Sequence, residues 1–172
     1  MKIATYIVFI ICLSSLTRIP DNYLKKIDKE ILSIFEIEAY QREPVLLDAS
    51  VLSKMDASFD SSNFFKVIKD ETHLGYFYFG KAPSKADEFD YVVVFDNELI
   101  IKKIKILAYR EDYGGEITSK RWLRQFKGSD RSSELKYGYD IKGISGATIS
   151  AEAMTKAVND LLKNLSKLPD HN

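Results

Sequence analysis

The stretch YVVVFDNELIIKKIKILAY, residues 91–109, contains the clearest hairpin signal in the chain. Residues 91–95 and 99–109 are rich in β-branched and aromatic side chains, which favour strands, and the polar residues 96–98 predict a turn between them. In the second arm, Ile104 and Ile106 alternate with Lys103 and Lys105. This period of two indicates an antiparallel strand with one apolar face, and we expect the lysines on its solvent face.

Two more strands are predicted upstream of this hairpin. Residues 63–70 and 74–79 are apolar and flank the polar turn 71–73. The second of them contains four consecutive aromatic residues, Tyr76 to Phe79, which is typical of a strand that packs on both faces. The stretch 41–63 is polar and is interrupted by Pro44.

Helical patterns lie at the two ends of this strand region. Residues 22–35 and the segment after residue 150 both carry apolar residues at helical spacing, and residues 117–126 predict a short helix held by Trp122. Helices grouped around a run of strands favour an α+β fold, an antiparallel sheet with packed helices. We expect one domain over residues 21–172, because the length suits a single apolar core.

Residues 1–20 differ in kind from the rest of the chain. Lys2 precedes an almost unbroken apolar run, residues 3–16, which ends before Arg18 and Pro20. The run is shorter than the roughly 20 residues that cross a bilayer and fits a secretory signal peptide, with a single short membrane anchor as the alternative. We therefore expect the domain to lie outside the cytoplasm, on the periplasmic side.

Composition excludes several functions. The 25 basic and 25 acidic residues cancel, so nucleic-acid binding is not expected. Cys12 is the sole cysteine, and His73 and His171 lie far apart, so we expect neither a disulfide within the chain nor a metal site. We also predict no catalytic residues, because the sequence lacks a Ser-His-Asp set and an activated cysteine. A hydrolase or a thiol enzyme therefore has little to build on in this sequence.

The segment KGISGATIS, residues 142–150, precedes the last predicted helix and consists mainly of small residues. Gly146 is free to take a positive φ, Ala147 leaves the backbone accessible, and the amides of the following helical turn attract an anion. A phosphate group suits such a place. The alternative is an ordinary helix cap, in which Thr148 or Ser150 accepts a hydrogen bond from the helix amides.

Two motifs resemble the FMN-binding domain found in the C subunit of the Na⁺-translocating NADH:quinone reductase and in the G subunit of the Rnf electron-transport complex. The first is Ser145-Gly146-Ala147-Thr148 before the carboxy-terminal helix. The second is the stretch 113–128, which is similar to the family's glycine loop, its Gly-Glu-Ile and its Trp-x-x-x-Phe-x-Gly. The resemblance covers roughly residues 63–165.

The resemblance implies FMN as the cofactor, linked through its phosphate to the hydroxyl of Thr148 by a flavin transferase outside the cytoplasm. Ser145, Gly146 and Ala147 would form the cradle, with Glu116 and Trp122 as further cofactor contacts. The implied function is electron transfer with membrane redox partners. A flavin-binding sensory or regulatory module, and a flavin-free interaction domain of the same fold, remain as alternatives.

The chain departs from the family pattern at two places. Lys142 stands where the family has an acid, six residues before the threonine, and the family's Glu-Thr-Pro-Gly-Leu-Gly loop is shortened to residues 111–114. A lysine near the phosphate favours simple non-covalent FMN binding, so both covalent and non-covalent binding are kept as hypotheses.

Overall fold

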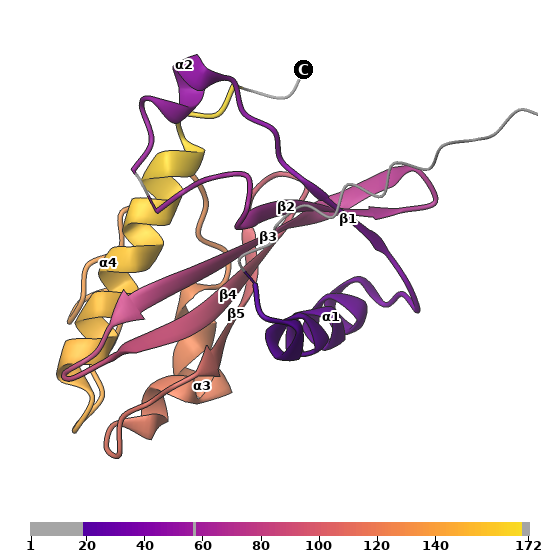
Figure 1. Ribbon diagram of the computed structural model, residues 1–172. Coiled ribbons are helices and arrows are strands. Elements are labelled where there is room, and N and C mark those ends of the chain that lie inside the picture. Colours follow the sequence, from indigo (N-terminus) through magenta and orange to yellow (C-terminus); the bar gives the residue numbers. More distant parts are fainter. Residues whose placement is uncertain (1–18, 57, 170–172) are drawn as a thin grey trace, which may run out of the picture.

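An antiparallel sheet of five strands forms the centre of the protein, and each strand pairs with its neighbour in the sequence (Figure 1). The computed structural model describes residues 19–56 and 58–169. In order across the sheet, the strands are β1 (Gln41–Pro44), β2 (Phe64–Lys69), β3 (Thr72–Pro83), β4 (Glu88–Asp96) and β5 (Ile101–Ala108). The α+β fold predicted from the sequence is confirmed. The predicted targeting segment lies, for residues 1–18, outside the described residues.

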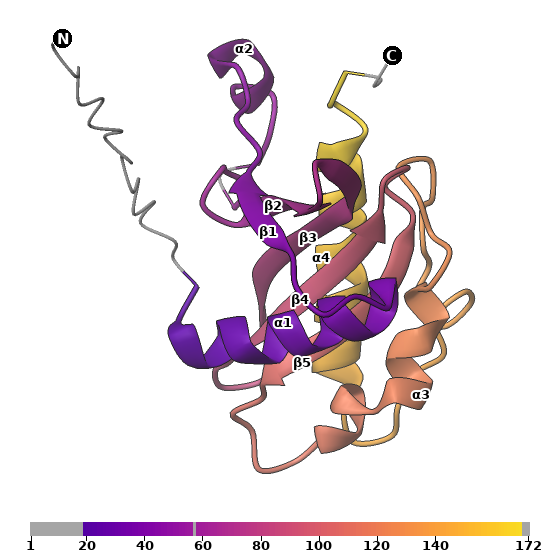
Figure 2. The ribbon, with the colours of Figure 1, turned by 90° about the vertical axis from the view of Figure 1, so that its right-hand side faces the viewer.

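One helix covers each face of the sheet (Figure 2). Helix α1 (Asp21–Phe35) packs on one face, and α4 (Thr148–Leu165) packs on the other. Because side chains alternate along a strand, β3 sends Tyr76 and Tyr78 toward α4 and Phe77 and Phe79 toward α1. All four aromatic side chains are buried, which confirms the prediction of a strand packed on both faces.

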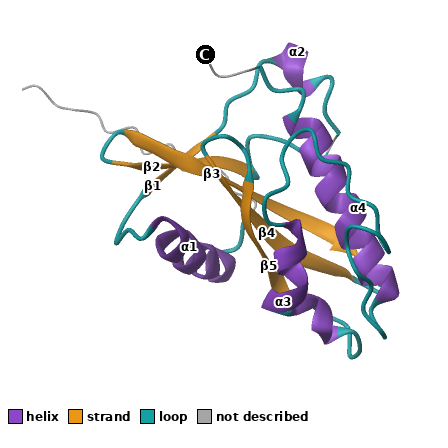
Figure 3. Ribbon diagram, turned by 180° about the vertical axis from the view of Figure 1, so that it is seen from behind, coloured by secondary structure: helices purple, strands orange, loops and turns teal. Residues whose placement is uncertain are grey.

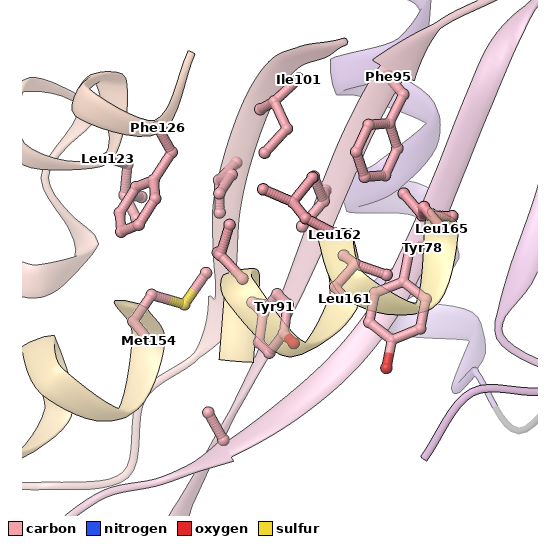
Figure 4. Packing of buried hydrophobic residues seen from close by; sticks show 14 of the residues in the cluster. Tyr78, Tyr91, Phe95, Ile101, Leu123, Phe126, Met154, Leu161, Leu162 and Leu165 are labelled. Carbon is pink, nitrogen blue, oxygen red and sulfur yellow. The ribbon is translucent and has the colours of Figure 1, made fainter. Parts of the chain in front are cut away.

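The core on the α4 side joins three parts of the chain (Figure 4). Met154 and Leu161 of α4 pack in the same cluster as Tyr91 of β4, and Leu123 and Phe126 close the cluster beside β5. Each of these buried side chains stabilises the fold by about 1.5–3 kcal/mol relative to an exposed one. The apolar stripe of α4 thus holds this helix on the sheet.

The predicted short helix over residues 117–126 is divided into three pieces. A 3₁₀ turn η1 (Gly115–Thr118), a helix α3 (Lys120–Leu123) and a second 3₁₀ turn η2 (Arg124–Phe126) follow one another. They lie on the same side of the sheet as α4 (Figure 3). Trp122 is buried in this core, as its predicted role requires.

Lys103 and Lys105 correct one expectation from the sequence. They lie on the face that α1 covers, and both form ion pairs with Glu30 of α1. Glu30 is 7% exposed. Helix α1 shields this face from solvent, so its charged groups need partners of opposite sign. The alternation correctly predicted the strand, but the solvent face assigned to the lysines was wrong.

Two short elements had no signal in the sequence. β1 is a four-residue edge strand that pairs with β2, and α2 (Ala49–Leu52) is a single helical turn. At the other side of β2, strand β3 is longer than its partner. Pairing with β2 ends at Phe64 opposite Tyr78, whereas β4 continues along β3 as far as Pro83.

Within the described residues, no helix is long and apolar enough to cross a membrane.

Candidate cofactor site

Helix α4 begins at Thr148 without a side-chain cap. Ala147 occupies the N-cap position, and no side chain of the described residues accepts a hydrogen bond there. The first hydrogen bond of the helix runs from the amide of Ala151 to the carbonyl oxygen of Ala147. The amides of residues 148–150 come before it and therefore have no acceptor within the helix. The ordinary capping role considered for Thr148 or Ser150 is therefore wrong. An uncapped helix start favours an anion at this point.

In the motif Ser145-Gly146-Ala147-Thr148, one residue is buried in the core and three are exposed. The side chain of Ala147 is 4% exposed and belongs to the core, whereas Ser145, Gly146 and Thr148 are exposed. Gly146 has φ +82°, as expected, and a Cβ atom placed there would meet no atom within 4 Å. The motif thus presents an open backbone and two hydroxyl groups to the outside.

The glycine loop lies directly against this motif. Gly114 has φ +80°, and a Cβ atom at this residue would lie 3.0 Å from the carbonyl oxygen of Gly146 and 3.1 Å from the Cβ of Ala147. Just before the loop, the hydroxyl of Tyr109 lies 3.0 Å from the Oγ of Ser150, within hydrogen-bond distance. Two motifs that are separate in the sequence therefore form one site.

Trp122 and Gln125 hold the backbone that leads into the motif. The indole Nε1 of Trp122 donates a 2.7 Å hydrogen bond to the carbonyl oxygen of Lys142. The Oε1 of Gln125 accepts a 2.8 Å hydrogen bond from the amide of Lys142. The sequence singled out Trp122 but assigned Gln125 no part in the site, because an amide side chain three residues after the tryptophan carries no chemical signal of its own.

A cleft of about 560 Å³ runs beside the motif. It is lined by Glu116, Trp122, Gln125 and the segment 142–144, together with Ser119, Arg121 and Arg124. Its volume is in the range of small-molecule and cofactor pockets. The structure thus brings Glu116 and Trp122 to one cleft that adjoins Ser145 through the preceding residues. The motif residues 145–148 themselves do not line this cleft.

Comparison with known families finds one similarity. Residues 85–163 match the family model described as the FMN-binding domain, so this part of the chain is similar to that family. The matched segment contains the glycine loop, Glu116, Trp122 and the motif 145–148, and it confirms the family resemblance drawn from those motifs. Comparison with curated proteins finds no significant match.

The residues of the site fit an FMN phosphate. The uncapped start of α4, the open backbone at Gly146 and the exposed hydroxyl of Thr148 lie together, and each suits a bound phosphoryl group. The flavin itself supplies the redox chemistry, and the protein holds it and tunes its potential. The family match and the geometry of the site both support FMN as the group that this site would hold.

Proposed function

We propose that the protein is an electron carrier whose FMN is bonded through its phosphate to the hydroxyl of Thr148. The observation that carries the proposal is the start of α4, where Thr148 is exposed and the first helical turn has no side-chain cap. Ser145, Gly146 and Ala147 form the surroundings of the phosphate in this proposal. Glu116 and Trp122 are the further contacts, through the adjoining cleft.

The proposed covalent attachment balances in atoms and charge when a flavin transferase uses flavin adenine dinucleotide as the donor of FMN. The hydroxyl oxygen of Thr148 bonds to the phosphorus of the FMN half, and the diphosphate bond of the donor breaks. AMP leaves, and the hydroxyl proton is released. The positive end of α4 stabilises the negative charge on the phosphoryl oxygens during this exchange.

The site supports electron transfer better than another reaction. The proposed roles need only binding and positioning, since a flavin accepts and donates electrons without a catalytic side chain. An exchange partner reaches the site easily because Ser145, Gly146 and Thr148 are exposed. We propose membrane redox partners and a place outside the cytoplasm, where the flavin transferase of the resembled family acts.

A gel experiment tests the covalent bond. The protein is co-expressed with a flavin transferase, denatured, separated on a gel and viewed under ultraviolet light. We expect a fluorescent protein band for the wild type and a dark band for Thr148→Val, which removes the hydroxyl at nearly constant volume. Ser145→Ala removes the neighbouring exposed hydroxyl and should leave the band fluorescent.

The outcomes separate the hypotheses. A wild type that is yellow in solution but dark on the gel would show non-covalent FMN binding. A dark Ser145→Ala with a fluorescent Thr148→Val would place the bond on the other hydroxyl. A protein that stays colourless after incubation with FMN would leave the flavin-free interaction domain as the remaining hypothesis.

A reporter fusion tests the proposed location. A carboxy-terminal reporter that is active only after export should give a signal, and a reporter that is active only in the cytoplasm should give none. The apolar run over residues 3–16 motivates this expectation. Strong activity of the cytoplasmic reporter would overturn it.

A further inference from the structure

A second cleft, of about 380 Å³, lies beside the first, and six of its eight lining residues are basic. Its floor is apolar, formed by Ile104 of β5 and Leu123 of α3. Its six basic residues, which we call the basic face, come from β5, α3, η2 and the residue after it: Lys102, Lys103, Lys120, Arg121, Arg124 and Lys127.

The positive charge of this face is largely uncompensated. Lys103 is paired with Glu30, and Lys102 lies 3.8 Å from Asp96. The other four basic residues have no ion-pair partner among the residues that the structure describes, and all four are exposed: Lys120, Arg121, Arg124 and Lys127. Like charges three and four residues apart repel each other, so this arrangement costs stability.

The basic face carries an excess of positive charge that the chain as a whole does not have. The whole chain has a formal net charge of zero, with 25 basic and 25 acidic residues. A local excess of positive charge in a neutral protein creates an electric field that attracts an anionic partner to one place. The excess therefore indicates a binding surface rather than a general means of solubility.

The basic face also adjoins the cofactor site. Arg121 and Arg124 line both clefts, and the first cleft extends to residues 142–144, directly before Ser145. A molecule bound on the basic face would share Arg121 and Arg124 with the cleft in which we place the contacts of the flavin, Glu116 and Trp122. Electron exchange requires such proximity.

We propose that the basic face docks the acidic surface of a partner protein that exchanges electrons with the flavin. Complementary charge speeds encounter and sets orientation, which suits a short-lived redox complex. The described large hydrophobic residues that are exposed, Leu46, Tyr113, Tyr139 and Ile149, do not line this cleft, so the face lacks the apolar side chains that insert into a lipid surface. The proposal rests on the proposed function for its redox role.

Binding is tested first without flavin, so that a failure of the proposed function does not affect the result. The probe is a fluorescein-labelled decaglutamate peptide, and anisotropy measures its Kd at low salt. We compare the wild type with Lys102→Glu/Lys120→Glu/Lys127→Glu, whose residues do not line the first cleft. The control variant, Lys25→Glu/Lys29→Glu/Lys69→Glu, has the same change in net charge at exposed residues elsewhere.

We expect the Kd of the peptide to rise about tenfold or more in the basic-face variant and to change less than about twofold in the control. Lys120→Gln/Lys127→Gln, which leaves Lys102 beside Asp96, should give a smaller rise in the same direction. Far-ultraviolet circular dichroism confirms that the variants are folded. Equal effects in the two triple variants would overturn the proposal, because net charge alone would then explain binding.

Electron transfer is tested second, with the FMN-loaded protein. Each reduced flavin gives two electrons and releases two protons, and two ferricyanide trianions each take one electron. We expect oxidation by ferricyanide at low salt to slow about tenfold in the basic-face variant, while oxidation by the hexaammineruthenium(III) trication does not slow. Unchanged ferricyanide rates would overturn the redox role.

Binding to phosphatidylglycerol vesicles separates a protein partner from a lipid surface. If the basic-face variant lost binding to these vesicles but kept its binding to the peptide, a lipid surface would replace the protein partner.

Discussion

The indole Nε1 of Trp122 donates its hydrogen to the carbonyl oxygen of Lys142, 2.7 Å away and 20 residues later in the chain. This bond joins α3 to the segment that leads into the cofactor motif. Trp122 is 6% exposed, whereas Lys142 is exposed, so the hydrogen bond between them is partly buried. The tryptophan thus acts on the site through backbone position as well as through the cleft that it lines.

Trp122→Phe removes this hydrogen bond and keeps most of the aromatic packing. We expect the free energy of unfolding to fall by about 1–3 kcal/mol, because a partly buried carbonyl oxygen loses its donor. Urea unfolding of the flavin-free protein measures this change, and the flavin content of the purified variant should fall as well. Tyr139→Phe alters an aromatic residue that is 84% exposed and should change neither quantity.

Gly114 and Gly115 form a matched pair for a test of the glycine loop. Gly114→Ala places a Cβ atom 3.0 Å from the carbonyl oxygen of Gly146 at φ +80°, whereas a Cβ atom at Gly115 meets nothing within 4 Å. We expect Gly114→Ala to cost about 1–2 kcal/mol of stability and to lower flavin loading. Gly115→Ala should change both by much less. Equal loss of flavin in the two variants would contradict the contact between loop and motif.

The ion pairs of Glu30 should make the free energy of unfolding depend on pH in the acid range. Burial raises the pKa of this carboxyl group, but hydrogen bonds from Lys103 and Lys105 outweigh burial and hold the pKa below its ordinary value of 4.5. The folded state therefore binds the proton less readily than the unfolded state. The resulting stability is present above pH 4.5 and is lost as the pH falls through the folded-state pKa.

Glu30→Gln should remove this dependence. We expect a loss of about 1.5–3 kcal/mol at pH 7, because the lysines lose a charged hydrogen-bond acceptor. The difference in unfolding free energy between wild type and variant should shrink below pH 4.5. Urea unfolding at several pH values measures it, and a constant difference down to pH 3 would contradict the assignment.

Lys142→Glu tests the departure from the family pattern. The change restores an acid six residues before Thr148 and removes a positive charge from the cleft beside the motif. We expect a larger share of protein with covalently bound flavin after co-expression with a flavin transferase, and weaker binding of free FMN to the Thr148→Val background. Lys142→Gln should weaken binding of free FMN without raising the covalent share.

Much of the fold could be predicted because periodicity decides it. The alternation along residues 91–109 and the aromatic run of β3 each specify a strand, and the stripe of α4 specifies a helix. β1 could not be predicted, because a four-residue edge strand made of Gln, Arg, Glu and Pro owes its conformation to pairing with β2. The place of Lys103 and Lys105 depends on α1, which packs on their face through contacts distant in the sequence.

The backbone conformation of the candidate site was predictable in part, for a different reason. Gly146 and Thr148 stand in a motif whose composition indicates close approach of a ligand, and the positive φ of Gly146 agrees with that prediction. The contact of Gly114 with Gly146 and the hydrogen bonds of Lys142 with Trp122 and Gln125 join segments distant in the chain. Sequence order alone does not predict such contacts.

The extra length of β3 beyond β2 bears on how copies of the protein meet one another. Past the last pairing with β2, the stretch from Gly80 to Pro83 borders β4 on one side, and on the other side no described strand pairs with it. Such an uncovered edge invites a strand from a second molecule and thereby aggregation. Pro83 has no N–H to offer, and Lys81, which is 3.9 Å from Glu88, places charge on the same border. The edge is thus protected against intermolecular sheet formation.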